Sequence, residues 1–169
     1  MRASLTSLVL LLALVAPGSA LAASIGLEAS LDCAQANAGA GTCGAGGSGT
    51  GSATITFDTD TNLLSWDIVW SGLSAPAILM HFHGPAAPDQ NAGIQVTLDH
   101  TSNPSIGAQV ITAQQASDLL AGLWYINVHT SNFGGGEIRG QVTTVPEPGS
   151  LALLGLSVGL AAALGRRRV

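Results

Sequence analysis

The segment "LLSWDIVWS", residues 63–71, alternates apolar and polar side chains in a way that decides the fold class. Successive side chains of an extended strand point to opposite faces, so this alternation predicts a strand with one apolar face. That face would hold Leu64, Trp66, Ile68 and Trp70. A polar turn cluster, "DTDTN" (residues 58–62), precedes it, and "SATITFD" (residues 52–58) shows the same period of two before the turn. The two segments predict an antiparallel hairpin that packs its tryptophans into a core.

Alternating segments continue on both sides of this hairpin. Upstream, "SIGLEASLD" (residues 24–32) alternates without a break, and a glycine-rich connection follows it at residues 39–51. Downstream strands are predicted at residues 77–83, 93–98, 124–129 and 137–142. One helix is expected between them, with Thr112 and Gln115 as a capping box and Gly122 at its end. Short alternating strands with Gly/Pro turns predict an all-β domain, an antiparallel β-sandwich or a small Greek-key barrel with one short helix.

Residues 1–22 have the features of a secretory signal peptide. Arg2 supplies the positive start, residues 8–16 are apolar, and Ala20-Leu21-Ala22 forms an A-x-A cleavage site for signal peptidase. An uncleaved anchor is the alternative, but the apolar run is too short to cross a bilayer. We therefore expect export, with one domain at residues 23–145.

The C-terminal segment, residues 146–169, combines three features. Its tripeptide is Pro146-Glu147-Pro148, its uncharged run covers residues 149–165, and Arg166, Arg167 and Arg168 follow. A helix over that run would be about 26 Å long, a marginal membrane span whose arginines would stay in the cytoplasm. An ordinary tail anchor is one interpretation. In this order, however, the three features resemble the PEP-CTERM sorting signal of Gram-negative bacteria that secrete exopolysaccharide.

That resemblance implies a route for the protein. The chain would have two terminal hydrophobic targeting helices and would remain in the inner membrane through the second one. An exosortase would then process the tail, leaving the protein at the cell surface or in the extracellular matrix of a biofilm.

Charge excludes one class of partner. Of the ten acidic residues, nine lie between the terminal segments, whereas Arg139 is the only cation there, so this part has a formal charge of −8. Nucleic-acid binding depends on cationic side chains that neutralise phosphates, so nucleic acid is excluded. Cations, neutral glycans or other proteins remain as partners.

Cys33 and Cys43 lie ten positions apart in a flexible Gly/Ala segment. An exported chain meets an oxidising compartment, so the natural interpretation is a disulfide that closes this loop. Metal binding by two isolated cysteines is the weaker alternative.

Three of the four histidines fall in predicted strands. The period of two places His81 and His83 on the face of residues 77–83 opposite Phe82, and places His129 opposite Val128. If both strands turn their apolar sides, including Ile78, to the core, the three histidines emerge together on the outer face. Imidazoles suit copper and zinc, so this set is a candidate metal site, with His100 as a doubtful further ligand.

The segments "GLSAPAILMHFHGPA" and "LLAGLWYINVHTSNFGGGEIRGQV" resemble the CHRD domain, which is named after chordin and also occurs in bacterial exported proteins. The resemblance covers residues 25–142. Its hallmark positions are His81, His83, Gly84, Asn127, His129, Thr130, Gly136, Glu137, Arg139, Gly140 and Gln141. Phe133 and Gly134 depart from the Asn-Pro that the family often has, which affects only a turn. The family has no established catalytic activity, which implies a role in binding or structure.

A weaker resemblance links His81, His83 and His129 to the copper ligands of copper/zinc superoxide dismutases. It makes a superoxide-dismutase-like sandwich an alternative to an immunoglobulin-like one. The chain has too few histidines for a full copper/zinc enzyme, but a copper-only or simple metal site stays open. The competing interpretation is structural: His81 and His129 would bond Glu137, Asn127 or the backbone, and Arg139 would pair with Glu137 or a turn carboxylate.

Two functions therefore stand before the structure is considered. The first is a non-enzymatic exported module of the cell surface or exopolysaccharide matrix that binds exopolysaccharide or an extracellular protein. The second is a copper- or zinc-binding protein, with a superoxide-dismutase-like redox role as its enzymatic form. The sequence contains no P-loop and no H-E-x-x-H motif, and no catalytic residue is assigned.

Overall fold

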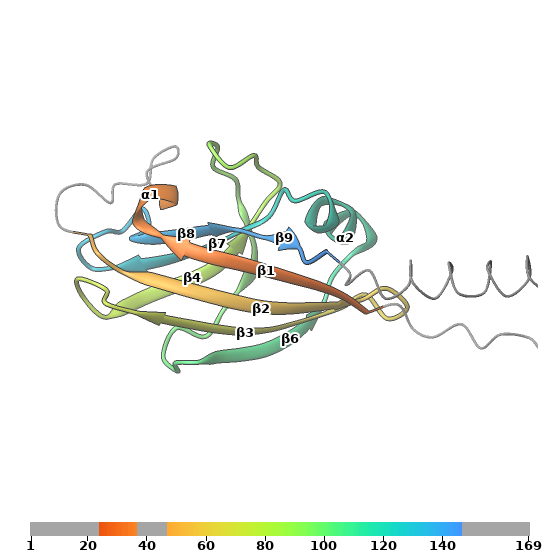
Figure 1. The fold of residues 1–169 in the computed structure, drawn as a ribbon, viewed down its shortest axis with the longest axis horizontal. Helices are drawn as coiled ribbons and strands as arrows, with labels where there is room; N and C mark the ends of the chain where they lie inside the picture. The colour runs from red at the N-terminus through yellow and green to blue at the C-terminus, as the bar shows by residue number, and fades with distance from the viewer. Residues whose placement is uncertain (1–23, 37–46, 147–169) are drawn as a thin grey trace, which may run out of the picture.

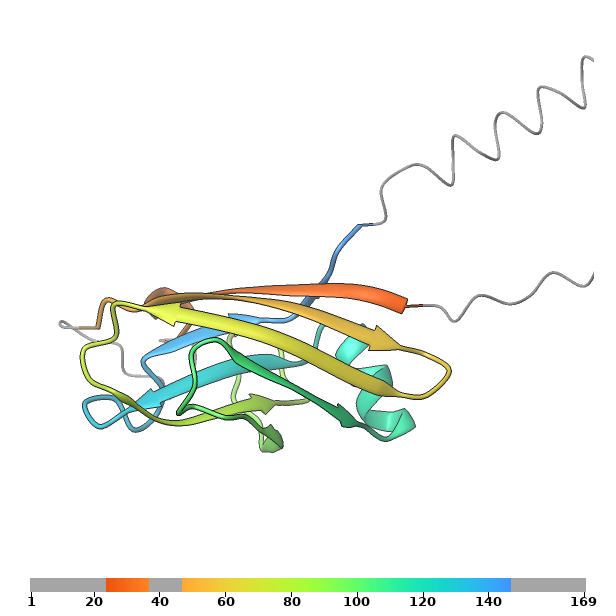
Figure 2. The same cartoon turned by 90° about the horizontal axis from the view of Figure 1, so that it is seen from below.

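The computed structural model describes residues 24–36 and 47–146, which form a 9-stranded antiparallel sheet that curls around one core (Figure 1). The strands are β1 (Ser24–Asp32), β2 (Thr50–Asp58), β3 (Leu63–Ser71), β4 (Ala77–His83), β5 (Ile94–Thr97), β6 (Ser105–Val110), β7 (Tyr125–Thr130), β8 (Ile138–Gln141) and β9 (Thr143–Thr144). Their order is β5-β4-β7-β8-β1-β2-β3-β6, with β9 paired to β1. Figure 2 shows the curl placing β4 and β7 opposite β1, β2 and β3. The predicted all-β antiparallel fold is confirmed.

The predicted hairpin is β2–β3. The two strands pair from Asp58↔Leu63 to Thr50↔Ser71 without a break. At their junction, Oδ1 of Asp58 accepts hydrogen bonds from the backbone N–H groups of Asp60 (3.0 Å) and Thr61 (2.9 Å). An aspartate that bonds the backbone ahead of it in this way favours a tight turn, so the polar cluster is a solvated turn, as predicted.

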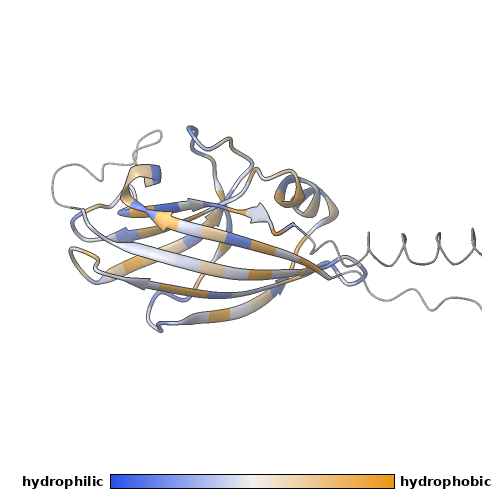
Figure 3. Ribbon diagram, viewed as in Figure 1, coloured by the Kyte–Doolittle hydropathy of each residue, from blue (hydrophilic) through white to orange (hydrophobic). Residues whose placement is uncertain are grey.

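The core is built from the apolar faces that the sequence pattern predicts, and Figure 3 shows polar and apolar residues alternating along the strands. Trp66 is buried and Trp70 packs against the core from a half-buried position. Other buried members from the two halves of the sheet are Leu27, Leu31, Ile55, Phe57, Leu64, Ile68, Met80, Phe82, Trp124, Ile126, Val128 and Ile138.

The predicted helix is α2 (Ala113–Leu120), with the capping box of Thr112 and Gln115 in place and Gly122 at φ +73° after its end. Leu119 turns into the core. Three elements were not predicted: strand β6, the two-residue strand β9, and a short helix α1 (Cys33–Ala36). Strand β9 pairs with β1, so the described chain enters and leaves the domain at the same end (Figure 1).

Several predictions concern residues outside the described ranges. The signal peptide (residues 1–22), the apolar run with its arginines, and Cys43 all belong to this group. Cys33 begins α1, and its disulfide with Cys43 stays a prediction. Within residues 24–36 and 47–146, no helix is long and apolar enough to cross a membrane.

Candidate metal centre

Strands β4 and β7 bring His81, His83 and His129 together. The strands are antiparallel neighbours, with Leu79↔His129, His81↔Asn127 and His83↔Tyr125 as partners. Ring centroids are 5.4 Å apart for His81 and His83, and 5.3 Å for His81 and His129. Each ring offers one nitrogen, and these three nitrogens lie within 4.8 Å of one another. The period of two therefore identified the correct face and a compact set of ligand atoms.

The prediction that this face is solvent-exposed was wrong. The side chains of His81, His83 and His129 are only 5%, 9% and 9% exposed, because residues 84–93 and 131–136 fold over them. Ile78, predicted for the core, is 44% exposed, because the register shifts between Ala77 and Leu79 where β4 begins to pair with β7.

Backbone carbonyls of the two covering segments determine the tautomers of two histidines. Nδ1 of His83 lies 3.0 Å from the carbonyl oxygen of Ala92, and Nδ1 of His129 lies 3.0 Å from that of Gly134. A carbonyl oxygen only accepts, so each Nδ1 carries the proton and each Nε2 keeps a lone pair. The Nε2 atom of His83 is buried without a hydrogen-bond partner.

The third imidazole closes the cluster. Nδ1 of His81 lies 3.4 Å from Nε2 of His129. Two imidazole nitrogens bound to one tetrahedral zinc ion at 2.0–2.1 Å would be separated by about 3.4 Å. In the absence of a metal, the proton on Nδ1 of His81 is donated to Nε2 of His129. The observed spacing therefore fits a shared ion as well as it fits a shared proton.

Burial keeps the three rings neutral. Burial, together with smaller effects of the neighbouring His129 and His83, lowers the pKa of His81 to about 4. Burial also lowers the pKa of His83 and of His129, against the opposing effect of their bonds to Ala92 and Gly134. Neutral imidazole is the form that binds a metal, so the cluster is in its ligand state at pH 7.

The expected ion pair between Arg139 and Glu137 is absent from the described part of the chain. Glu137 instead accepts hydrogen bonds from the N–H and Oγ of Ser74 and from Oγ1 of Thr130. Arg139 donates to the carbonyl oxygens of Gln90 (2.9 Å) and Ala87 (3.3 Å). Among the described residues, His81 and His129 do not bond Glu137 or Asn127, but the expected backbone alternative is formed by His129, whose Nδ1 bonds the carbonyl oxygen of Gly134.

Several other residues singled out by the sequence make hydrogen bonds or packing contacts within the fold. Asn127 donates to the carbonyl oxygen of Gly135, and Gln141 donates to those of Ala86 and Gly122. Gly84 lies against Trp124, Gly136 against Asn127, and Gly140 against the backbone of Ser30. His100 is half-buried in the turn after β5 and does not belong to the cluster.

Tyr125 is the residue beside the cluster to which the sequence assigned no role. Its ring stacks on His83 with centroids 5.0 Å apart and planes 7° apart. Tyr125 lies two and four residues before Asn127 and His129 in the same strand, so the period of two places it on their face, and this is the signal that the sequence offers.

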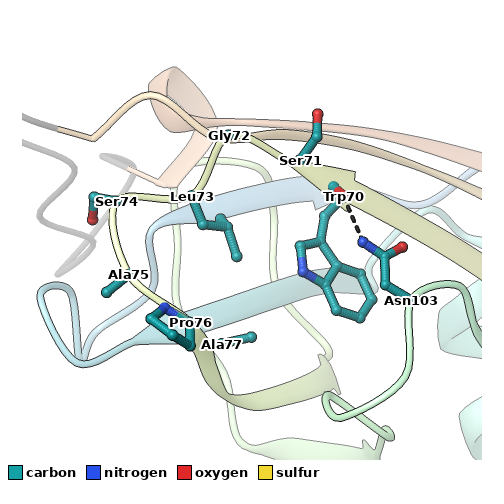
Figure 4. Close-up of a pocket in the computed structure, with 9 residues that line it drawn as sticks. All are labelled: Trp70, Ser71, Gly72, Leu73, Ser74, Ala75, Pro76, Ala77 and Asn103. Atoms are coloured by element: carbon teal, nitrogen blue, oxygen red, sulfur yellow. Dashed lines mark hydrogen bonds between the residues drawn. The ribbon is translucent and has the colours of Figure 1, made fainter.

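A hollow elsewhere on the surface offers no alternative metal site. It lies beside the β3–β4 connection, where Asn103 donates a 2.7 Å hydrogen bond to the carbonyl oxygen of Trp70 (Figure 4). Its lining consists of Trp70, Ser71, Gly72, Leu73, Ser74, Ala75, Pro76, Ala77 and Asn103. None of these side chains carries a charge or an imidazole, so the hollow is distinct from the histidine cluster.

Comparison with known proteins gives two family matches. The CHRD domain model matches residues 27–142, and the PEP-CTERM protein-sorting motif matches residues 144–168. No curated protein and no solved structure matches the chain. The sorting motif implies export, a C-terminal membrane anchor before processing, and processing by an exosortase. With most of its length covered by the first match, the chain belongs to the CHRD domain family and is an exported surface protein.

Proposed function

We propose that this protein is an exported CHRD module that binds one copper or zinc ion through His81, His83 and His129. The observation that carries the proposal is the buried, unpartnered Nε2 of His83 within a set of three imidazole nitrogens. Imidazole ligands suit both copper and zinc, and three of them leave a coordination position open.

A purely structural polar cluster accounts less well for these contacts. A buried nitrogen without a partner costs free energy. Four other buried side-chain atoms of the described residues share this cost, but His83 Nε2 is the one that lies in a group of three imidazoles. In addition, His83 and His129 each donate Nδ1–H to a backbone carbonyl. Metal-bound histidines have this same outer bond, which orients the ring and leaves the other nitrogen for the ion.

Metal content tests the proposal directly. The purified protein is dialysed with copper or zinc, freed of excess ion, and analysed by mass spectrometry beside a His81/His83/His129→Gln triple variant. We expect about one equivalent in the wild type and none in the triple variant, with His100→Gln as the matched control that keeps its metal. Equal metal content in wild type and triple variant would refute the site.

A redox role is the second candidate, and the all-imidazole ligand set favours it because such ligands accommodate copper. The chemistry supplied by bound copper would be one-electron transfer at the open position. A superoxide dismutation assay on the copper-bound protein distinguishes it from simple metal binding. A rate equal to that of free copper at the same concentration would leave metal binding as the function.

The sorting motif supports the proposed location. We propose that residues 1–22 are removed by signal peptidase, and that residues 146–169 hold the domain of residues 23–145 at the inner membrane until exosortase acts. The domain then functions at the cell surface or in the exopolysaccharide matrix of a Gram-negative bacterium, by binding or structure. Replacing Pro146-Glu147-Pro148 with alanines should leave an unprocessed chain in the membrane fraction of an exosortase-containing host. Normal release of that variant would contradict the route.

A further inference from the structure

We infer that Tyr125 and Arg139 are positioning residues for His83, holding its ring in the plane and tautomer that leave Nε2 without a partner. The inference rests on the proposed metal site and extends it to residues that cannot themselves bind the ion. Two routes, one through aromatic rings and one through the backbone of residues 84–93, connect Arg139 to the same imidazole.

The first route is a column of stacked groups. The guanidinium carbon of Arg139 lies 3.5 Å from the centroid of the Tyr125 ring. The other face of the column is His83, whose ring is 5.0 Å from that of Tyr125 and within 7° of parallel. A cation over an aromatic ring is favourable, more so when it is shielded from water, and here Arg139 is only 2% exposed. The column therefore restricts rotation of the His83 ring about its side-chain bonds.

The second route runs through Ala92. Its carbonyl oxygen accepts a hydrogen bond from Nδ1 of His83, 3.0 Å away. The backbone N of Ala92 donates a hydrogen bond to the hydroxyl oxygen of Tyr125, 3.1 Å away. Arg139 fixes the preceding residues by donating to the carbonyl oxygen of Gln90 and to Oδ1 of Asn91. The Ala92 carbonyl that selects the His83 tautomer is thus held in place by Tyr125 directly and by Arg139 through the neighbouring residues.

The partners of Arg139 explain why a cation is buried here. A buried charge is costly unless its donors are satisfied, and an ion pair is the usual compensation. The guanidinium contacts carbonyl and carboxamide oxygens and the Tyr125 ring, and the nearby Asp89 carboxylate opposes the lowering of its pKa by burial. All but the Gln141 contact belong to the segment that covers His83 or to the ring that stacks on it. The placement of Arg139 therefore orders the groups around the His83 imidazole.

The test measures zinc affinity of the purified full chain by competition with a chromophoric chelator. Outer-sphere partners of metal-binding histidines are typically worth about 10- to 100-fold in affinity. We expect that loss in Tyr125→Leu, which removes both the stack and the hydroxyl, and in Arg139→Gln. Tyr125→Phe keeps the stack and should lose less. Ile55→Val, a core change in β2, should keep wild-type affinity while lowering stability.

Nitrogen-15 NMR of the histidine rings supplies a second readout on the metal-free chain. The wild type should show His83 as the Nδ1–H tautomer, and Tyr125→Leu should show a mixture of tautomers. Unchanged zinc affinity in both Tyr125→Leu and Arg139→Gln would overturn this inference and leave the metal site standing. Absence of both zinc and copper from the wild type would overturn the proposed function and this inference together.

Discussion

At the scale of single residues, Glu137 is a buried carboxylate whose charge is set by the groups that bond it. It is fully buried and accepts bonds from Ser74 N–H (2.6 Å), Ser74 Oγ (2.9 Å) and Thr130 Oγ1 (2.7 Å). Burial by itself raises the pKa of Glu137, but the bonds from Ser74 and Thr130 outweigh it and the pKa is lowered. The charged form is therefore the one that the fold requires.

Glu137→Gln should accordingly destabilise the protein by about 1–3 kcal/mol, since an amide would turn an N–H group toward donors that need an acceptor. Urea unfolding at pH 7 measures the loss. The matched control is Glu28→Gln on the exposed face of β1, which should change the unfolding free energy by less than about 0.5 kcal/mol. Equal effects of the two substitutions would contradict this account of Glu137.

The lowered pKa of His81 predicts that acid destabilises the metal-free protein. The pKa is lowered from 6.5 to about 4, chiefly by burial, so between these pH values the unfolded chain binds a proton that the native state does not. The free energy of unfolding therefore falls as the pH drops through this window and is unaffected above it. Urea unfolding in the presence of a chelator, at several pH values from 7 to 4, measures this slope. His81→Gln should flatten the slope, and a variant as pH-dependent as the wild type would contradict the prediction.

At the scale of elements, the segment of residues 131–136 contains three glycines, and two of them, Gly134 and Gly136, have different requirements. Gly136 adopts φ +121°, and a Cβ there would overlap the carboxamide of Asn127. Gly134 has open space around its Cα and supplies the carbonyl oxygen that binds His129. The turn over the cluster therefore requires the absence of a side chain at Gly136 and the backbone carbonyl of Gly134.

Gly136→Ala should lower the unfolding free energy by about 1–3 kcal/mol, from backbone strain and from the displaced Asn127. It should also weaken zinc binding, because the displaced turn carries the partner of His129. Gly134→Ala is the matched control, expected to unfold at nearly the wild-type temperature and to bind zinc normally. Thermal unfolding and zinc titration of the two variants check both expectations, and a Gly134→Ala variant as unstable as Gly136→Ala would disprove the assignment.

The elements also show which parts of the structure could be predicted from sequence. Strands such as β1 and β3 have one face in the core, so their alternation was readable. Strand β6 is an edge strand whose segment "SIGAQV" alternates over only three apolar residues, Ile106, Ala108 and Val110, and these are exposed instead of facing the core. The bond that orients His83 and the main partners of Arg139 are backbone carbonyls of residues 84–93, and carbonyls leave no mark in sequence. The face of the site was therefore predictable, but its cover was not.

At the scale of the whole molecule, the acidic surplus and the neutral histidine cluster act on the same ligand at different distances. Residues 23–145 carry nine acidic side chains against Arg139, and Arg139 is buried. A surface with this balance attracts cations and repels anions, and salt screens the effect. The general field raises the local concentration of a metal cation, whereas only the three imidazoles provide a specific site.

Zinc should therefore stabilise the folded protein in two separable ways. An ion that binds only the native state adds about 2.7 kcal/mol when it is free at 100 times its dissociation constant, so the unfolding temperature should rise with zinc. The rise should continue with the logarithm of the free zinc concentration above the dissociation constant, and should disappear in the His81/His83/His129→Gln variant, which keeps the acidic surface. Magnesium, a hard cation that prefers oxygen ligands, should produce no comparable rise. Differential scanning calorimetry at 150 mM salt, which suppresses the general field, measures these effects. An equal rise with magnesium, or a rise that survives in the triple variant, would assign the stabilisation to surface charge instead of the histidine cluster.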